Sequence, residues 1–183
     1  MSRLPDATAP FGWKRAAELG LSFRRTTDDD LEFLARVHAA SRTDEFAVAP
    51  FPEAQKAGFV AMQFHLQHMH FRNQYPNADW LVTMRGGEDV GRLYLDRWPD
   101  QHRLIDIAFL PEHRGTGAGE ALLRDLMDEA AAAGKPLTVH VEKHKRAMWL
   151  CRRLGFTVAQ DEGAYDLMRW TPPRRRAQLR IAR

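Results

Sequence analysis

The sequence predicts an α/β (α+β) fold with a mixed, mostly antiparallel central sheet of about seven strands and helices on both faces. Segments that alternate every second residue are interleaved with segments of helical periodicity, in the order β-α-α-β-β-β-α-β-α-β-β. Strands therefore come in runs as well as alternating with helices. Such a mixture favours a partly antiparallel sheet covered on both sides.

The first elements are predicted from local signals. Residues 1–20 are expected to form an N-terminal arm with a short helix at 13–19, and the alternation of 21–27 predicts a strand. Thr27 precedes three aspartates, which is typical of a helix start because a hydroxyl can cap the first amides and acids favour the positive end of the helix dipole. Residues 41–52 are expected to form a loop.

A long helix is predicted from Pro52 to about Arg72, since proline is tolerated in the first helical turn. Its spacing places two stripes side by side on the helix surface. The apolar stripe consists of Phe59, Met62, Leu66 and Met69. The polar stripe beside it consists of Gln63, Gln67 and His70.

The remaining elements follow the same logic. Strands are expected at 80–84, 90–98, 102–110, 137–141, 156–160 and 164–170. One helix is predicted at 119–133, with an apolar face of Leu122, Leu123, Leu126, Met127 and Ala130, and another at 146–154, with an apolar face of Ala147, Leu150, Cys151 and Leu154. Glycine follows each of these two helices and is expected to end it.

Length and composition favour one domain at 21–171, followed by a basic tail at 172–183. The chain has 183 residues, of which 44% are hydrophobic and 28% charged. Its net charge of +3 comes from the last eleven residues, which contain five arginines and no acid. We expect this tail to be a solvated terminus, and nucleic acid binding by it is the less favoured alternative.

The location is expected to be cytoplasmic. No apolar run is long enough for a membrane helix, and the first fifteen residues lack the apolar centre of a secretory signal. The single cysteine excludes an intrachain disulfide and a cysteine zinc cluster, which fits a reducing compartment. We expect neither a metal nor a membrane partner.

The segment PEHRGTGAGEALL at 111–123 places three glycines between a strand and a helix. The first amides of a helix lack internal partners, so such a turn can hold a pyrophosphate. A P-loop is excluded because Glu120 and Ala121 stand where Lys-Ser/Thr is needed, and the Rossmann fingerprint has a different glycine spacing. A tight turn without a ligand stays the alternative.

Two motifs give the sequence a family resemblance. RGTGAG at 114–119, preceded by LPEH, resembles the coenzyme A pyrophosphate loop of the GNAT acetyltransferase superfamily. VEKHKRAMWLCRRLGF at 141–156 is similar to the family's V-x-x-x-N-P-A-x-x-L-Y-x-x-x-G-F. The resemblance covers about residues 20–170 and implies the GNAT-type sheet and an N-acetyltransferase that uses acetyl-CoA.

The resemblance also implies which residues bind acetyl-CoA. They are Arg114, Gly115, Thr116, Gly117, Ala118, Gly119 and Glu120 in the loop, the backbone of Ala108, Phe109 and Leu110 in a bulged strand, and Lys145. Two positions depart from the family pattern: Lys145 replaces its usual asparagine and Cys151 its usual tyrosine. These departures keep open a non-catalytic CoA-binding module of the same fold.

Three residues are candidates for proton transfer. Asp106 is the first candidate for a base, because an acid is unexpected in the apolar strand LIDIAF, and a pairing with Arg92 or Arg103 is the alternative. His140 is the second candidate. Cys151 occupies the position of the proton donor, although its place on an apolar stripe also fits a core residue.

The resemblance implies that the acceptor lies across the splayed strands from the cofactor, where we expect the polar stripe of Gln63, Gln67 and His70 to line a pocket. Aromatic walls from Trp80, Tyr94 and Trp98 are possible, although these rings can equally be sheet packing. The acceptor class, a small molecule or a peptide amine, stays open. A homodimer in which the N-terminal arm packs on a neighbour is a further possibility.

Overall fold

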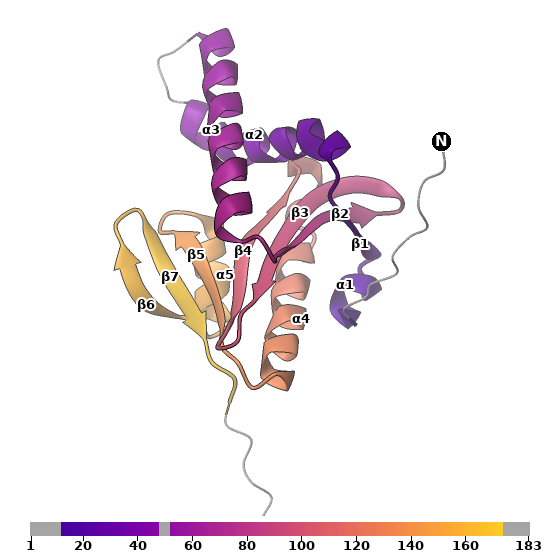
Figure 1. Cartoon of the computed structure of the whole chain (residues 1–183), viewed down its shortest axis with the longest axis vertical. Coiled ribbons are helices and arrows are strands. Elements are labelled where there is room, and N and C mark those ends of the chain that lie inside the picture. The colour runs from indigo at the N-terminus through magenta and orange to yellow at the C-terminus, as the bar shows by residue number, and fades with distance from the viewer. Residues whose placement is uncertain (1–11, 48–51, 174–183) are drawn as a thin grey trace, which may run out of the picture.

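The computed structural model describes residues 12–47 and 52–173 (Figure 1). Its seven strands form one sheet in the order β1-β2-β3-β4-β5-β7-β6. Neighbouring strands are antiparallel throughout, except that β4 and β5 are parallel. The predicted mixed, mostly antiparallel sheet is therefore confirmed.

The elements follow the predicted order. The strands are β1 (Leu21–Arg25), β2 (Asp79–Arg85), β3 (Glu88–Arg97), β4 (His102–Phe109), β5 (Leu137–Glu142), β6 (Thr157–Glu162) and β7 (Tyr165–Trp170). The helices are α1 (Lys14–Glu18), α2 (Leu31–Ala47), α3 (Glu53–Gln74), α4 (Ala118–Ala132) and α5 (Arg146–Arg153). Single 3-10 turns at Asp28–Asp30 and Pro111–His113 precede α2 and α4.

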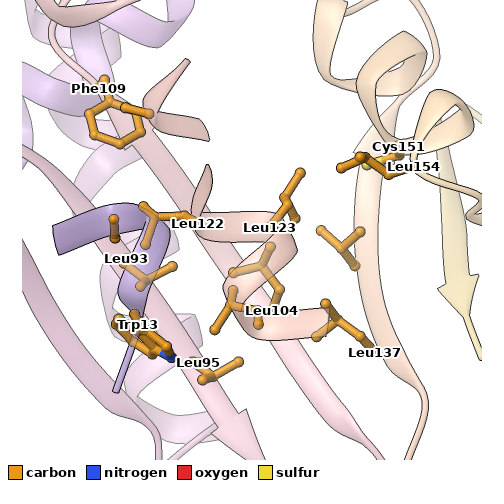
Figure 2. Close-up of a cluster of buried hydrophobic side chains, with 14 of the residues drawn as sticks. Trp13, Leu93, Leu95, Leu104, Phe109, Leu122, Leu123, Leu137, Cys151 and Leu154 are labelled. Atoms are coloured by element: carbon orange, nitrogen blue, oxygen red, sulfur yellow. The ribbon is translucent and has the colours of Figure 1, made fainter. Parts of the chain in front are cut away.

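The helices cover both faces of the sheet (Figure 1), and each face has its own apolar cluster. The larger cluster joins α1, α4 and α5 to the sheet, and Figure 2 shows Leu122 and Leu123 of α4 packed between strand residues and Cys151 of α5. Leu122 and Leu126 are fully buried, so the predicted apolar face of α4 is confirmed. A smaller, more aromatic cluster lies under α2 and α3.

Part of the predicted N-terminal arm belongs to the larger cluster. The Trp13 side chain is 2% exposed and meets the ring of Phe23 edge-on, with ring centroids 4.9 Å apart. Its indole nitrogen donates to Glu129 on α4 at 2.9 Å, and the Ala16 amide donates to Asp125 at 2.8 Å. The short helix is therefore confirmed, and it packs on α4 of its own chain.

The predicted loop at 41–52 was wrong at 41–47, and its positions 48–51 lie outside the described residues. Helix α2 continues to Ala47, because residues 41–47 contain neither glycine nor proline to end it. The Ser41 hydroxyl donates to the carbonyl of His38 at 2.6 Å, which keeps this polar residue compatible with a helix. The predicted start is confirmed, since the Thr27 amide donates to Asp30 at 2.7 Å.

Helix α3 presents a different face to the sheet from the one predicted, and α5 differs from its prediction at one position. The apolar stripe of α3 is about half exposed, with exposed fractions of 47% for Phe59 and 59% for Leu66, whereas Phe64 is 8% exposed. Helix α3 is apolar on two sides, and the side with Val60 and Phe64 packs inward. In α5, the predicted face is confirmed for Leu150, Cys151 and Leu154, whereas Met148 is buried in place of Ala147, which is exposed.

Candidate functional site

The site begins where β4 and β5 separate. Within the described residues, these strands pair only through His102–Leu104 of β4 and Leu137–Val139 of β5. The register with β3 shifts at the same point, because Tyr94 pairs with Asp106 while Leu95 pairs with Leu104. Ile105 is thus the extra residue of a bulge, and the bulge implied by the resemblance is confirmed.

Beyond the bulge, one edge of β4 faces the gap. The Leu110 amide donates to the carbonyl of Val90 at 2.9 Å, so this amide is directed at β3. Antiparallel strands alternate between residues that bond the partner and residues that point away. Ala108 therefore also faces β3, and the backbone groups of Ile107 and Phe109 face the gap. The predicted backbone contacts to the cofactor were Ala108, Phe109 and Leu110. They therefore omitted Ile107, which faces the gap, and included Leu110, whose amide faces β3.

The open edge leads into the predicted glycine turn. Gly115 and Gly117 have φ angles of 71° and 83°, which side chains with a Cβ rarely adopt. Gly117 caps α4, a helix of 15 residues, whose first amides lack helical partners. A Cβ added at either glycine meets no atom within 4 Å, so the surface in front of the turn is open. This shape fits a pyrophosphate group.

Side-chain hydrogen bonds hold the glycine turn in place. The Arg114 Nε donates to the Phe109 carbonyl at 2.9 Å, and the Thr116 hydroxyl donates to the His113 carbonyl at 3.1 Å. Arg85, at the end of β2, reaches Thr116 Oγ1 at 3.4 Å. Sequence reasoning missed Arg85, because it lies 31 positions before Thr116 and no local pattern links them.

Glu120, in the first turn of α4, carries a charge that neighbouring arginines offset. Its carboxylate accepts from Arg124 at 2.9 Å and 3.0 Å and from Arg153 of α5. The hydrogen bond from Arg124, followed by the charges of Arg153 and Arg124, lowers the pKa of Glu120. The acid is therefore held ionised beside two cations, which limits its repulsion of an anionic ligand.

The two residues that depart from the family pattern lie on α5. Lys145 caps the helix: its amide donates to the Glu142 carbonyl at 3.1 Å, and its carbonyl accepts from Met148 at 3.0 Å. The Cys151 thiol lies in the larger apolar cluster beside Leu154 (Figure 2), and burial raises its pKa to about 11. This thiol is a weak acid, and the residue is 2% exposed.

On the opposite face, a buried arginine organises the layer under α2 and α3. Arg92 is 3% exposed, and its Nε donates to Asp106 Oδ2 at 2.6 Å. Its two terminal nitrogens donate to the Leu34 carbonyl at 3.3 Å and to Gln67 Oε1 at 3.4 Å. The guanidinium also lies over the Tyr94 ring, 5.4 Å from its centroid. Asp106 thus forms the predicted alternative pair with Arg92, immediately after the bulge.

His140 lies on the β5 side of the gap, where both ring nitrogens have partners. Arg103 contacts Nδ1, and Glu162 lies 3.1 Å from Nε2. The same terminal nitrogen of Arg103 also lies 3.3 Å from Nε2. His140 is consequently occupied on both sides.

Only part of the predicted polar stripe of α3 reaches the layer around Arg92. Gln67 bonds Arg92, Gln63 is half-buried with an Oε1 that has no hydrogen-bond partner in the described structure, and His70 is exposed. Sequence reasoning missed His38, which is 2% exposed. Burial, aided by the charges of Arg92 and Arg42, lowers the pKa of His38.

The predicted aromatic walls belong to the smaller apolar cluster. The rings of Trp80 and Tyr94 lie 4.5 Å apart, and the ring of Trp98 stacks on Tyr75 at 6.1 Å. These contacts favour sheet packing for the three aromatic residues.

Neither a metal centre nor a membrane span emerges from the part of the chain that the structure covers. Over residues 12–47 and 52–173, no cluster of three or more His, Cys, Asp and Glu side chains is arranged to hold a metal ion. No helix within the same ranges has the length and apolar character to cross a membrane. The predicted basic tail falls outside the described residues from position 174 onward.

Solved structures share this architecture. PaiA N-acetyltransferase from Thermoplasma acidophilum, crystallised with coenzyme A, superposes with a TM-score of 0.61 at 16% identity, over 82% of this chain and 98% of that one. YncA from Salmonella typhimurium, a putative acetyltransferase solved with acetyl-CoA, gives a TM-score of 0.51 at 18% identity, over 86% and 96%. At these identities, the likeness shows the fold.

A third structure is closer in sequence. The histone acetyltransferase HPA2 and related acetyltransferase from Corynebacterium glutamicum is 25% identical, with a TM-score of 0.56 over 84% of this chain and 97% of that one. No curated protein is significantly similar to the sequence.

The family model described as the Acetyltransferase (GNAT) family matches residues 40–156. That match includes the split between β4 and β5, the glycine turn and both departures on α5. The chain belongs to the GNAT acetyltransferase family.

Proposed function

We propose that the protein is an acyl-CoA-dependent N-acyltransferase that transfers acetyl from acetyl-CoA directly to an amine. The observation that carries the proposal is the continuity of the open β4 edge with the positive-φ turn at Gly115 and Gly117. PaiA, named as an N-acetyltransferase and crystallised with coenzyme A, supports the same cofactor. We expect the protein to act in the cytoplasm.

The backbone supplies the cofactor contacts in this proposal. The amides from Arg114 to Glu120 hold the pyrophosphate, as the resemblance implies, and the edge of β4 lines the pantetheine arm. Bound acetyl-CoA supplies a thioester carbonyl. The Ile107 or Phe109 amide, which faces the gap, donates a hydrogen bond to that carbonyl oxygen as negative charge develops on it.

Asp106 is our candidate for handling the acceptor amine. An amine with an ordinary pKa of about 10.4 is almost fully protonated near pH 7, so a neutral amine must be generated. Arg92 fixes the carboxylate of Asp106 just after the bulge, where bulges often aim side chains at a site. Asp106 then orients the ammonium group and accepts its proton, directly or through water. His140 is a weaker candidate because both its nitrogens are engaged.

The departing thiolate takes its proton from solvent in this proposal. Cys151 is buried and its pKa is raised, so we assign it to the core. Lys145 caps α5 near the cofactor and remains a candidate contact to it. In this proposal, the acceptor site is lined by Gln63, Gln67 and Asp106. The acceptor is an amine of either a small molecule or a peptide.

The buried thiol at position 151 also supports a second candidate, a CoA-binding module without catalysis. Release of free thiol from acetyl-CoA across a panel of polyamine, aminoglycoside, amino acid, lysine peptide and N-terminal peptide acceptors distinguishes the two. Transfer predicts release with one class, and a drop of about 10²–10⁴ in turnover for Asp106→Asn with unchanged acetyl-CoA affinity. Tight binding of acetyl-CoA without release from any class would favour the module.

A further inference from the structure

The outer face of α5 carries an unusually exposed aromatic ring. Trp149 is 73% exposed, the largest value among the exposed large apolar side chains of the described residues. Arg146 and Arg153 lie three residues before it and four after it, so the three side chains share one face of the helix. A tryptophan held in water between two cations contributes little to folding, and such residues are typical of binding surfaces.

This face adjoins the glycine turn. Arg153 contacts the carboxylate of Glu120, which belongs to the first turn of α4. Arg124, one turn further along α4, donates to the same carboxylate at 2.9 Å. Two cations therefore share one acid beside the helix start, which leaves an excess of positive charge next to the place assigned to the pyrophosphate.

We propose that Trp149, Arg153 and Arg124 form the subsite for the adenosine 3′-phosphate end of coenzyme A. The proposal rests on the proposed function, because it extends the same ligand from the pyrophosphate outward. The Trp149 indole stacks on the adenine ring, as aromatic side chains do on exposed bases. The two guanidinium groups bind the 3′-phosphate, whose charge complements theirs.

The chemistry of the ligand fits this surface better than a structural role does. The Arg153–Glu120 pair is largely exposed, with 66% of the arginine side chain and 32% of the acid accessible, and exposed pairs contribute little stability. Phosphate can compete for the guanidinium groups without disrupting the fold. Arg153 and Arg124 therefore determine whether the protein distinguishes coenzyme A from its 3′-dephospho form, and Trp149 contributes to the binding of both.

The test measures the affinities of the full-length protein for coenzyme A and 3′-dephospho-coenzyme A by calorimetry at low salt. We expect the wild type to bind coenzyme A about tenfold more tightly, since charge-assisted phosphate contacts are strong. Arg153→Gln should reduce that ratio to about twofold. Trp149→Ala should weaken both ligands by a similar factor of about fivefold or more.

Arg152→Gln is the matched control. It removes the same charge from α5, but Arg152 lies about 100° around the helix from Arg153 and contributes to another flank. This variant should keep the wild-type ratio. Quenching of tryptophan fluorescence by coenzyme A provides a second measurement, which should largely disappear in Trp149→Phe.

The outcomes separate the inference from the proposed function. Equal wild-type affinity for the two ligands, or unchanged affinity in Trp149→Ala, would overturn the adenosine subsite and leave acetyl-CoA binding in place. An equal loss of discrimination in Arg152→Gln would also overturn it, because general charge rather than this face would then be responsible. Failure to bind either ligand would overturn both proposals.

Discussion

The two faces of the sheet are built from different kinds of contact. The face under α4 and α5 combines apolar packing with a backbone turn: its cluster is made of apolar side chains, and the ligand contacts proposed for it are mainly amides. The face under α2 and α3 buries an ion pair, Arg92 with Asp106, and a histidine, His38. The proposed cofactor half therefore depends on local sequence, and the proposed acceptor half on residues distant in sequence.

The buried arginine should produce the largest effect. Arg92→Ala leaves Asp106, Gln67 and the Leu34 carbonyl without their common donor, so we expect a loss of about 3–5 kcal/mol in the free energy of unfolding. Urea denaturation measures it. Coenzyme A affinity of the folded fraction should change little, because the ligand turn lies in the other half.

A double substitution tests whether the charge is the cause. Arg92→Met combined with Asp106→Leu removes both charges while keeping apolar volume, and should recover most of the stability lost in Arg92→Ala. If the double variant were as unstable as the single one, packing rather than the ion pair would hold this layer together.

The orientation of α3 predicts a contrast between near neighbours. Phe64 is 8% exposed and Leu66 is 59% exposed. Phe64→Ala should lower the unfolding free energy by about 3 kcal/mol, whereas Leu66→Ala should change it by about 0.5 kcal/mol or less. Thermal and urea unfolding of both variants checks the contrast, and the reverse order would mean that the apolar stripe of α3 faces the sheet.

Cys151 tests the cofactor half with a smaller change. Cys151→Ala removes one buried sulfur, so a cost of about 1 kcal/mol is expected. Turnover should stay within about twofold of the wild type, because we assign the thiol no proton transfer. A large loss of turnover with intact acetyl-CoA affinity would instead identify Cys151 as the proton donor.

The smallest expected effect is a pH dependence in the acceptor half. Burial lowers the pKa of His38, so the folded protein binds its proton less readily than the unfolded chain does. Stability from this group is present above the unfolded pKa of about 6.5 and is lost as the pH falls from there through the lower folded pKa. Urea midpoints should therefore fall from pH 7.5 to pH 5.

His38→Gln should make that fall smaller. Some dependence should remain, because burial also lowers the pKa values of His68 and His102. An unchanged pH profile in His38→Gln would show that His38 is not buried in its neutral form.

How well each region could be predicted depends on whether its contacts are local in sequence or distant. The glycine turn and α4 could be predicted because their signals lie within a few residues of one another: positive φ needs glycine, and a single apolar stripe defines the helix face. Helix α3 has apolar residues on two sides, so periodicity could not choose between them. The side that packs inward also carries Gln67, whose Oε1 accepts a hydrogen bond from Arg92 of β3.

The catalytic candidates were hardest to predict because their surroundings depend on contacts between residues distant in sequence. Asp106 was identified as an acid in an apolar strand, but its partner and the adjacent bulge depend on the pairing of β3 with β4. His38 and Arg85 were missed because their neighbours are distant in sequence: Phe64 of α3 lies beside His38, and Thr116 of the glycine turn lies beside Arg85. Cys151 followed its apolar stripe into the core, as the alternative interpretation stated.

The most direct test of the central claim is the acetyl-CoA affinity of Gly117→Trp, measured by calorimetry beside Gly163→Trp. Both glycines have positive φ angles, 83° and 78°, and in both a Cβ meets no atom within 4 Å, but Gly163 lies in the turn between β6 and β7 and not at the start of α4. The account predicts that Gly117→Trp abolishes binding while Gly163→Trp binds like the wild type. Unchanged affinity in Gly117→Trp would contradict the assignment of the turn to acetyl-CoA.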